Sequence, residues 1–169
     1  MANHIHVFTY KEGLLSRVAH DLRLHVEPRG IEVKRSGEQV TATMDPTALI
    51  VDGAMSGSQL DDGALDERDR RKIVETMRRE ILDTQRFTSI RFTGKAVARG
   101  ERALDVDGEL ELVGVRRPLA FTATREGRRI RARVTLQPSR WGIRPYKALA
   151  GAIRLQDRLT VEIDLDESE

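Results

Sequence analysis

The chain has 169 residues, 33% of them charged, and a formal net charge of +2. This length fits one domain with a sizeable core, and we expect residues 1–169 to form a single domain. The small net charge gives no reason to expect nucleic acid or an anionic membrane as a partner. The absence of cysteine excludes disulfides, thiol nucleophiles and thiolate metal sites.

The N-terminal residues lack the basic region and the apolar run of a signal peptide. No apolar stretch approaches the roughly 18 residues that a spanning helix needs. We therefore expect a cytoplasmic protein with no stable membrane insertion.

The first third of the chain consists of short segments in which apolar and polar residues alternate. Residues 4–10 and 21–28 are predicted strands, and 31–44 is predicted to be a hairpin. Between the first two, residues 13–19 are predicted to form a short helical segment. Residues 52–66 are rich in Gly, Ser and Asp, which indicates an extended surface connection.

One longer helix is predicted over residues 66–82, with Asp66 as its N-cap. Ile73, Met77 and Ile81 recur at a helical spacing and form one apolar stripe. This stripe favours a helix packed on the wall or the end of a sheet. A basic helix on a membrane surface is the alternative, but glutamates among its arginines lower the positive charge.

The second half of the chain has the most regular alternation. Residues 104–112, 119–125, 130–136 and 153–165 each place apolar side chains on one face, and only Asp157 interrupts the last row. Such alternation is typical of antiparallel sheets with one solvated face. We therefore expect an all-β fold in which these four segments are adjacent strands, closed around an apolar interior.

Arginines dominate the predicted outer face of one of these strands, at Arg129, Arg131 and Arg133. Surfaces that bind single-stranded nucleic acid usually add exposed aromatic side chains for base stacking, and none is interleaved here. The acidic residues within 105–111 favour a different interpretation, in which opposite charges pair across neighbouring strands. We expect no nucleic acid partner.

No spacing in the chain matches a common catalytic signature, so we expect a binding protein with no catalytic residues rather than an enzyme. The histidines His4, His6, His20 and His25 are the only candidate metal-binding cluster. A metal site also needs a third or fourth ligand and partners for the imidazole N–H groups. Nothing in the sequence brings these four together, and we expect no metal.

Four segments, in their order and spacing, resemble the YceI-like family, the bacterial lipocalin-like proteins associated with polyisoprenoid binding. These segments are 16–20, 81–94, 108–119 and 139–143. The Gly-Val-Arg-Arg-Pro turn and the Arg-Trp-Gly-Ile sequence are the most specific parts. The resemblance spans nearly the whole chain.

The resemblance implies an eight-stranded antiparallel lipocalin-like barrel with one flanking helix and an elongated apolar pocket. It implies that the protein binds or carries a long-chain lipid of polyisoprenoid, isoprenoid-quinone or fatty-acyl type, which would be its apolar small-molecule partner. Small inner residues such as Ala42, Ala123 and Ala132 favour a hollow interior. Two alternatives stay open: a ligand-free scaffold or stress-response interaction protein with a filled barrel, and a lipid-modifying enzyme that uses His20 and Arg140.

The candidate ligand-binding residues are assigned to the lid, wall and rim of this pocket. They are Leu14, Leu15, Val18, His20, Phe92, Leu110, Phe121, Val134, Arg140, Trp141, Ile143 and Val161. His20 and Arg140 are the expected polar contacts to a head group, because apolar pockets orient ligands with a few polar groups. No cofactor is expected beyond a bound isoprenoid or fatty-acyl lipid, and homodimerisation is left open.

Overall fold

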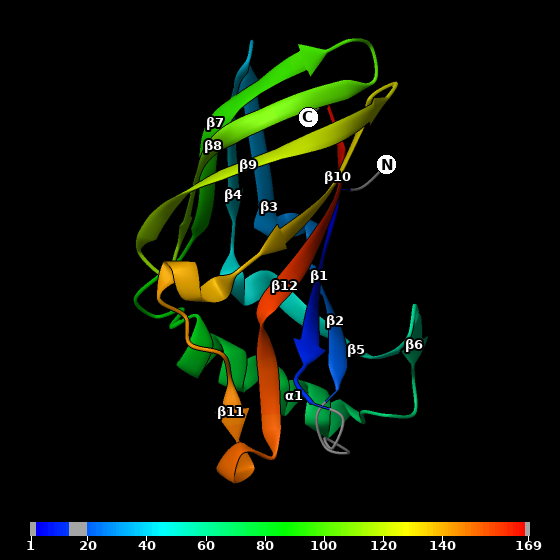
Figure 1. Ribbon diagram of the computed structural model, residues 1–169, viewed down its shortest axis with the longest axis vertical. Coiled ribbons are helices and arrows are strands. Elements are labelled where there is room, and N and C mark those ends of the chain that lie inside the picture. Colours follow the sequence, from blue (N-terminus) through cyan, green and yellow to red (C-terminus); the bar gives the residue numbers. More distant parts are fainter. Residues whose placement is uncertain (1–2, 14–19, 168–169) are drawn as a thin grey trace.

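The computed structural model describes residues 3–13 and 20–167, which form a curled antiparallel sheet and an α-helix beyond one end of it (Figure 1). The strands are β1 (His4–Lys11), β2 (Asp21–Val26), β3 (Ile31–Ser36), β4 (Gln39–Met44), β5 (Leu49–Ser56), β6 (Gln59–Asp61), β7 (Ile90–Arg99), β8 (Ala103–Leu112), β9 (Val115–Glu126), β10 (Arg129–Leu136), β11 (Lys147–Ala148) and β12 (Ile153–Asp166). The helices are α1 (Glu67–Thr76), the π-helical turn η3 (Met77–Ile81) that continues it, and the 3-10 turns η1 (Pro28–Gly30), η2 (Pro46–Ala48), η4 (Pro138–Trp141) and η5 (Leu149–Gly151).

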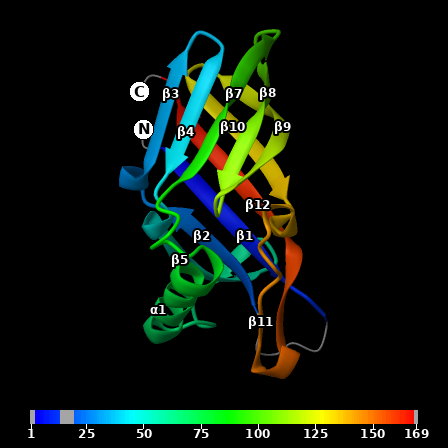
Figure 2. The same ribbon diagram turned by 90° about the vertical axis from the view of Figure 1, so that its left-hand side faces the viewer.

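The strands follow the order β3-β4-β7-β8-β9-β10-β12-β1-β2-β5-β6, and β11 pairs with the start of β12. Every pair is antiparallel, which confirms the predicted all-β class and the predicted adjacency of β8, β9, β10 and β12. Figure 2 shows how strongly the sheet curls and how α1 and the β11–β12 hairpin extend from the same end. Both elements therefore lie at the same end of the curled sheet.

The predicted count of eight strands is wrong, because the sheet has twelve. Two long strands are each interrupted by a 3-10 turn that begins with proline, which splits β2 from β3 and β4 from β5. The two interruptions lie side by side: the backbone N–H of Glu27 donates to Ala48 O (2.9 Å), and that of Asp45 donates to Gly30 O (2.8 Å). The short strands β6 and β11 complete the difference, so the lipocalin-like description holds only for the overall curl.

The expected surface connection over 52–66 is also wrong in its first part. Strand β5 continues to Ser56 and pairs with β2 across a bulge, and both Gly53 and Ala54 are buried. Glycine and alanine are only weakly hydrophobic, so this strand shows no clear alternation of apolar and polar residues in the sequence. From Ser56 the chain turns directly into β6.

The predicted helix is confirmed, and its N-terminus has the expected cap. The side chain of Asp66 accepts from the backbone N–H of Asp69 (2.8 Å), and the Asp69 side chain accepts in return from the N–H of Asp66. Ile73, Met77 and Ile81 are half-buried and pack against the core. None of the helices in the described residues is long and apolar enough to span a membrane.

Candidate functional site

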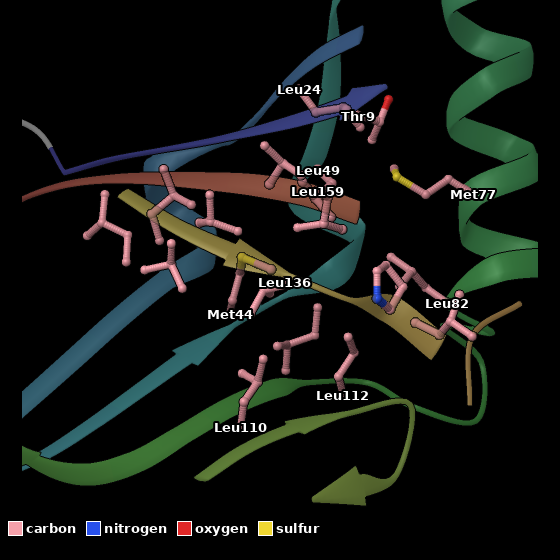
Figure 3. A pocket seen from close by; sticks show the side chains of 18 of the residues that line it. Thr9, Leu24, Met44, Leu49, Met77, Leu82, Leu110, Leu112, Leu136 and Leu159 are labelled. Atoms are coloured by element: carbon pink, nitrogen blue, oxygen red, sulfur yellow. The ribbon is translucent and has the colours of Figure 1, made fainter. Parts of the chain in front are cut away.

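The interior of the curled sheet contains an apolar cavity of about 860 Å³. Leucines from several strands point into it, among them Leu110 and Leu112 of β8, Leu136 of β10 and Leu159 of β12 (Figure 3). Alternate residues of the strands form its wall, because the inner face of each strand is apolar. Its volume lies within the roughly 300–1,000 Å³ of ligand-binding pockets.

Seven of the sequence-predicted site residues line this cavity. They are His20, Phe92, Leu110, Phe121, Val134, Ile143 and Val161. The rings of Phe92 and Phe121 pack at 6.1 Å between centroids. Ala42, Ala123 and Ala132 line it as well, and their small side chains leave open the volume that larger residues would fill.

The cavity reaches the surface between α1 and the β11–β12 hairpin. Lys72 of α1 and Leu149 of the hairpin both line the cavity, and both are exposed to solvent. At the far end of the sheet, Glu167 forms ion pairs with Arg35 and with Arg125, the latter at 2.5 Å. The cavity therefore has an apolar wall along its length, a charged cluster at one end and an opening to solvent at the other.

One polar atom faces this interior without a partner. Among the described residues, Thr9 Oγ1 and Arg78 Nε are the only buried side-chain polar atoms that lack a hydrogen bond. Thr9 lines the cavity from β1, on the side where Met77 lies in Figure 3. A buried hydroxyl without a partner costs about 1–3 kcal/mol, so Thr9 offers a hydrogen bond to a bound polar group.

Asp157, which interrupts the apolar row of β12, also lines the cavity. It accepts hydrogen bonds from the backbone N–H of Ser139 (2.9 Å), from the Ser139 hydroxyl and from Gln137 Nε2 (3.0 Å). Burial acts to raise its pKa, but these hydrogen bonds outweigh burial and hold the pKa below its usual value. Asp157 is therefore an ionised group that fixes the η4 segment to β12.

The structure corrects the predicted positions of Trp141 and Arg140, since neither lines the cavity. The Trp141 side chain is 1% exposed, and its Nε1 donates to the carbonyl oxygen of Leu110 at 2.8 Å. Arg140 stacks its guanidinium on the indole, 5.3 Å from the ring centroid, and is exposed. The reason is that η4 turns the indole into the core, which leaves Arg140 outside.

The predicted lid residues Leu14, Leu15 and Val18 lie outside the described residues, as does most of the predicted helical segment 13–19. Thr9, Met77 and Leu149 line the cavity but were absent from the predicted site. Thr9 could have been found, because it follows Ile5 and Val7 on the apolar face of the first strand.

The histidines do not form one cluster. His6 and His25 are paired across β1 and β2 on the outer face, whereas His20 lines the cavity. Burial, followed by the positive charge of Arg23, lowers the pKa of His6. Asp52 accepts from Arg23 (2.8 Å) and lies 2.5 Å from the Nδ1 of His25. In residues 3–13 and 20–167, no three His, Cys, Asp or Glu side chains are placed to hold a metal ion.

Residues 3–166 match the family described as the YceI-like domain. The chain belongs to this family. Among solved structures it is similar to Burkholderia cenocepacia BcnA, with 11% identity, a TM-score of 0.61 and coverage of 96% of this chain and 94% of that one. It is similar to a polyisoprenoid binding domain from Saccharophagus degradans, with 13% identity, a TM-score of 0.57 and coverage of 96% and 91%.

A variant of the Campylobacter jejuni YceI protein with a monobromobimane guest is also similar, with 10% identity, a TM-score of 0.55 and coverage of 82% and 81%. No curated protein matches the chain significantly. These structural likenesses establish the fold, and the family match covers nearly all of the chain.

Proposed function

We propose that the protein binds a long-chain apolar lipid, of polyisoprenoid, isoprenoid-quinone or fatty-acyl type, inside its sheet and carries it unchanged. The observation that supports this most directly is the apolar cavity of about 860 Å³. It argues against an interior filled by side chains. The polyisoprenoid binding domain from Saccharophagus degradans shares the fold and adds support.

The energetics of burial fit a chain-like ligand. Each buried methylene contributes roughly 0.8 kcal/mol, so about ten carbons would contribute about 8 kcal/mol. This gross gain matches the binding free energy of a complex with a dissociation constant of about 1 μM. The cost of immobilising the ligand is subtracted from it, so a chain longer than about ten carbons is needed for micromolar affinity.

Most of the residues that line the cavity are apolar, which favours a ligand with a long apolar chain and a polar end. Thr9 has a free hydroxyl within the cavity, and His20 and Asp157 line the cavity as well. A polyprenyl alcohol, a quinone or a fatty acid each combines a long apolar tail with one such end. The enzyme alternative loses support, because Arg140 does not line the cavity.

Mass spectrometry of the purified native protein, together with organic extraction, tests this proposal. We expect a co-purifying hydrophobic compound, or saturable binding of a polyprenyl alcohol, an isoprenoid quinone or palmitic acid. If no compound co-purifies and none of the three probes binds, the lipid-carrier proposal is wrong.

Filling the cavity is expected to weaken binding. Ala132→Phe places a ring in the cavity wall and should lower the affinity for the best probe at least about tenfold, the equivalent of about two buried methylenes. Ala120→Phe on β9 is the matched control, because Ala120 is exposed and does not line the cavity. Equal affinities of the two variants would show that the ligand lies elsewhere.

The Thr9 hydroxyl is expected to lower the unfolding free energy of the ligand-free protein and to raise its affinity for a ligand with a polar group. Thr9→Val removes a buried hydroxyl without a partner, so the ligand-free protein should gain about 1 kcal/mol in unfolding free energy, measured by urea denaturation. The same change should weaken binding of a polyprenyl alcohol about fivefold and leave the matching hydrocarbon unaffected, a difference of about 1 kcal/mol. Thr93→Val at an exposed position of β7 should change neither quantity.

A further inference from the structure

Leu149, at the tip of the β11–β12 hairpin, is an apolar side chain held out in solvent. Among the described residues, only Leu149 (66%) and Val97 (42%) are large hydrophobic residues with high exposure. Leu149 and Ala150 both have left-handed backbone angles, with φ of +50° and +54°. Such angles are unfavourable for residues with a Cβ and concentrate at functional positions. The tip therefore presents Leu149 outward in a conformation that the surrounding turn maintains.

The segment around this tip has more cationic than anionic side chains. Within residues 137–159 there are five cationic side chains, Arg140, Arg144, Lys147, Arg154 and Arg158, and one carboxylate, Asp157. Asp157 is already hydrogen-bonded to Ser139 and Gln137. In the part of the chain that the structure describes, no carboxylate forms an ion pair with Arg144, Lys147 or Arg154.

The arginines of the outer wall differ in this respect. Arg131 pairs with Glu126 at 3.0 Å, and Arg133 pairs with Glu162 at 2.6 Å. Exposed cations without an ion-pair partner among the described residues also occur elsewhere, at Arg91 and Arg102 for example, so what distinguishes the hairpin is that such cations surround an exposed leucine at the cavity mouth. Across the mouth, Lys72 of α1 adds an exposed cation without an ion-pair partner among the described residues.

The tip is also continuous with the binding cavity. Leu149, Ala148 and Tyr146 of this segment line the cavity, as does Lys72 on the opposite side of the mouth. Figures 1 and 2 show α1 and the β11–β12 hairpin extending from the same end of the sheet. A surface that contacted the tip would therefore face the cavity opening.

We propose that this end of the protein docks on an anionic phospholipid bilayer, with Leu149 entering the interface and Arg144, Lys147 and Arg154 contacting lipid phosphates. Basic residues are attracted to anionic lipid surfaces, and an apolar side chain among them adds burial in the headgroup region. A protein partner would need a larger complementary patch, about 800 Å² on each side, than one leucine provides. The purpose of docking rests on the proposed function, because a lipid carrier must meet the bilayer that holds its ligand.

Co-sedimentation of the full chain with vesicles tests this inference. We expect binding to phosphatidylcholine vesicles with about 30% phosphatidylglycerol, no binding to pure phosphatidylcholine, and release when salt rises to about 0.5 M. Leu149→Asp, and separately Lys147→Glu with Arg154→Glu, should each lower vesicle partitioning at least about tenfold. Circular dichroism confirms that the variants fold.

Two control variants separate the tip from general effects of charge and polarity. Val97→Asp changes the other exposed hydrophobic residue, and Arg99→Glu with Arg102→Glu alters net charge as much as the hairpin pair does. Both controls should bind vesicles like the unchanged protein. Equal losses in tip and control variants, no binding to anionic vesicles, or a Leu149-dependent dimer in sedimentation velocity would each overturn the docking inference.

The same measurements distinguish this inference from the proposed function. Lys147→Glu with Arg154→Glu should keep its affinity for a detergent-solubilised polyprenyl alcohol, because neither residue lines the cavity. If the unchanged protein binds the alcohol but no vesicle, docking is wrong and lipid binding stands. If it binds anionic vesicles but no apolar probe, docking stands and the lipid-carrier proposal is wrong.

Discussion

Trp141→Ala is expected to lower the free energy of unfolding by about 3–5 kcal/mol, measured by urea denaturation monitored by circular dichroism. The indole is 1% exposed and belongs to the main hydrophobic core. Its removal leaves a void that the surrounding strands cannot fill, and it also removes the donor to Leu110 O. Both losses act in the folded state, so the unfolding midpoint should fall markedly.

Two further variants separate packing from hydrogen bonding at this position. Trp141→Phe keeps most of the apolar volume but removes the Nε1 donor, so it should cost about 1–3 kcal/mol. Val97→Ala, at an exposed position, should stay within about 0.5 kcal/mol of the unchanged protein. A cost below about 1 kcal/mol for Trp141→Ala would contradict the buried position of the indole.

The inner wall of the cavity could be predicted from the sequence because strand side chains alternate with a period of two. Once residues 153–165 were assigned to one strand, Val161 and Leu159 had to share a face. The register confirms this assignment, since Val161 lies opposite both Val7 of β1 and Val134 of β10. The helix was predicted equally well, because its cap and its apolar stripe are both local features.

The rim of the site was predicted less well because it consists of short turns. Residues 137–152 have no periodicity, so nothing local shows whether Trp141 faces the cavity or the core. That choice depends on the hydrogen bond to Leu110, which lies 31 positions away in the sequence. The orientation of Leu149 is set by left-handed backbone angles that leucine does not favour, so propensity gives no signal for it.

The predicted number of strands was wrong because turns interrupt strands that continue in the same sheet. Prolines at η1 and η2 mark interruptions, but the sequence does not show that the chain resumes in the same sheet on the other side. The alternation predicted a sheet around an apolar interior, and the resemblance to the YceI-like family implied an elongated pocket within it. The interruptions, β6 and β11 came only from the structure.

Gly94→Val is expected to destabilise the protein by about 3 kcal/mol, the upper part of the range for overpacked interiors. A Cβ at Gly94 would lie 2.3 Å from the carbonyl oxygen of Asp107 and 2.7 Å from the Cα of Gly108. These are backbone atoms of the paired strand, so no side-chain rotation relieves the clash. The strands β7 and β8 would have to separate where Gly94 and Gly108 face each other.

The glycine pair also positions a residue of the cavity wall. A Cβ at Gly108 would lie 2.8 Å from the Cζ of Phe92, so the ring of Phe92 occupies the space that a side chain at Gly108 would need. An aromatic ring over a glycine on a neighbouring strand compensates for the missing side chain and supports the curvature of the sheet. Gly108→Val should therefore both destabilise the fold and displace Phe92 from the cavity.

Gly63→Ala is the matched control for these glycine variants. A Cβ at Gly63 would meet only the Asp61 Oδ1, at 3.6 Å, and Gly63 has no left-handed backbone angle. Its unfolding free energy should stay within about 0.5 kcal/mol of the unchanged protein, because the position is exposed and uncrowded. If Gly94→Val were as well tolerated as Gly63→Ala, β7 and β8 could not approach as closely as the structure shows. The part of the cavity wall that Phe92 forms would then differ in shape from the one described.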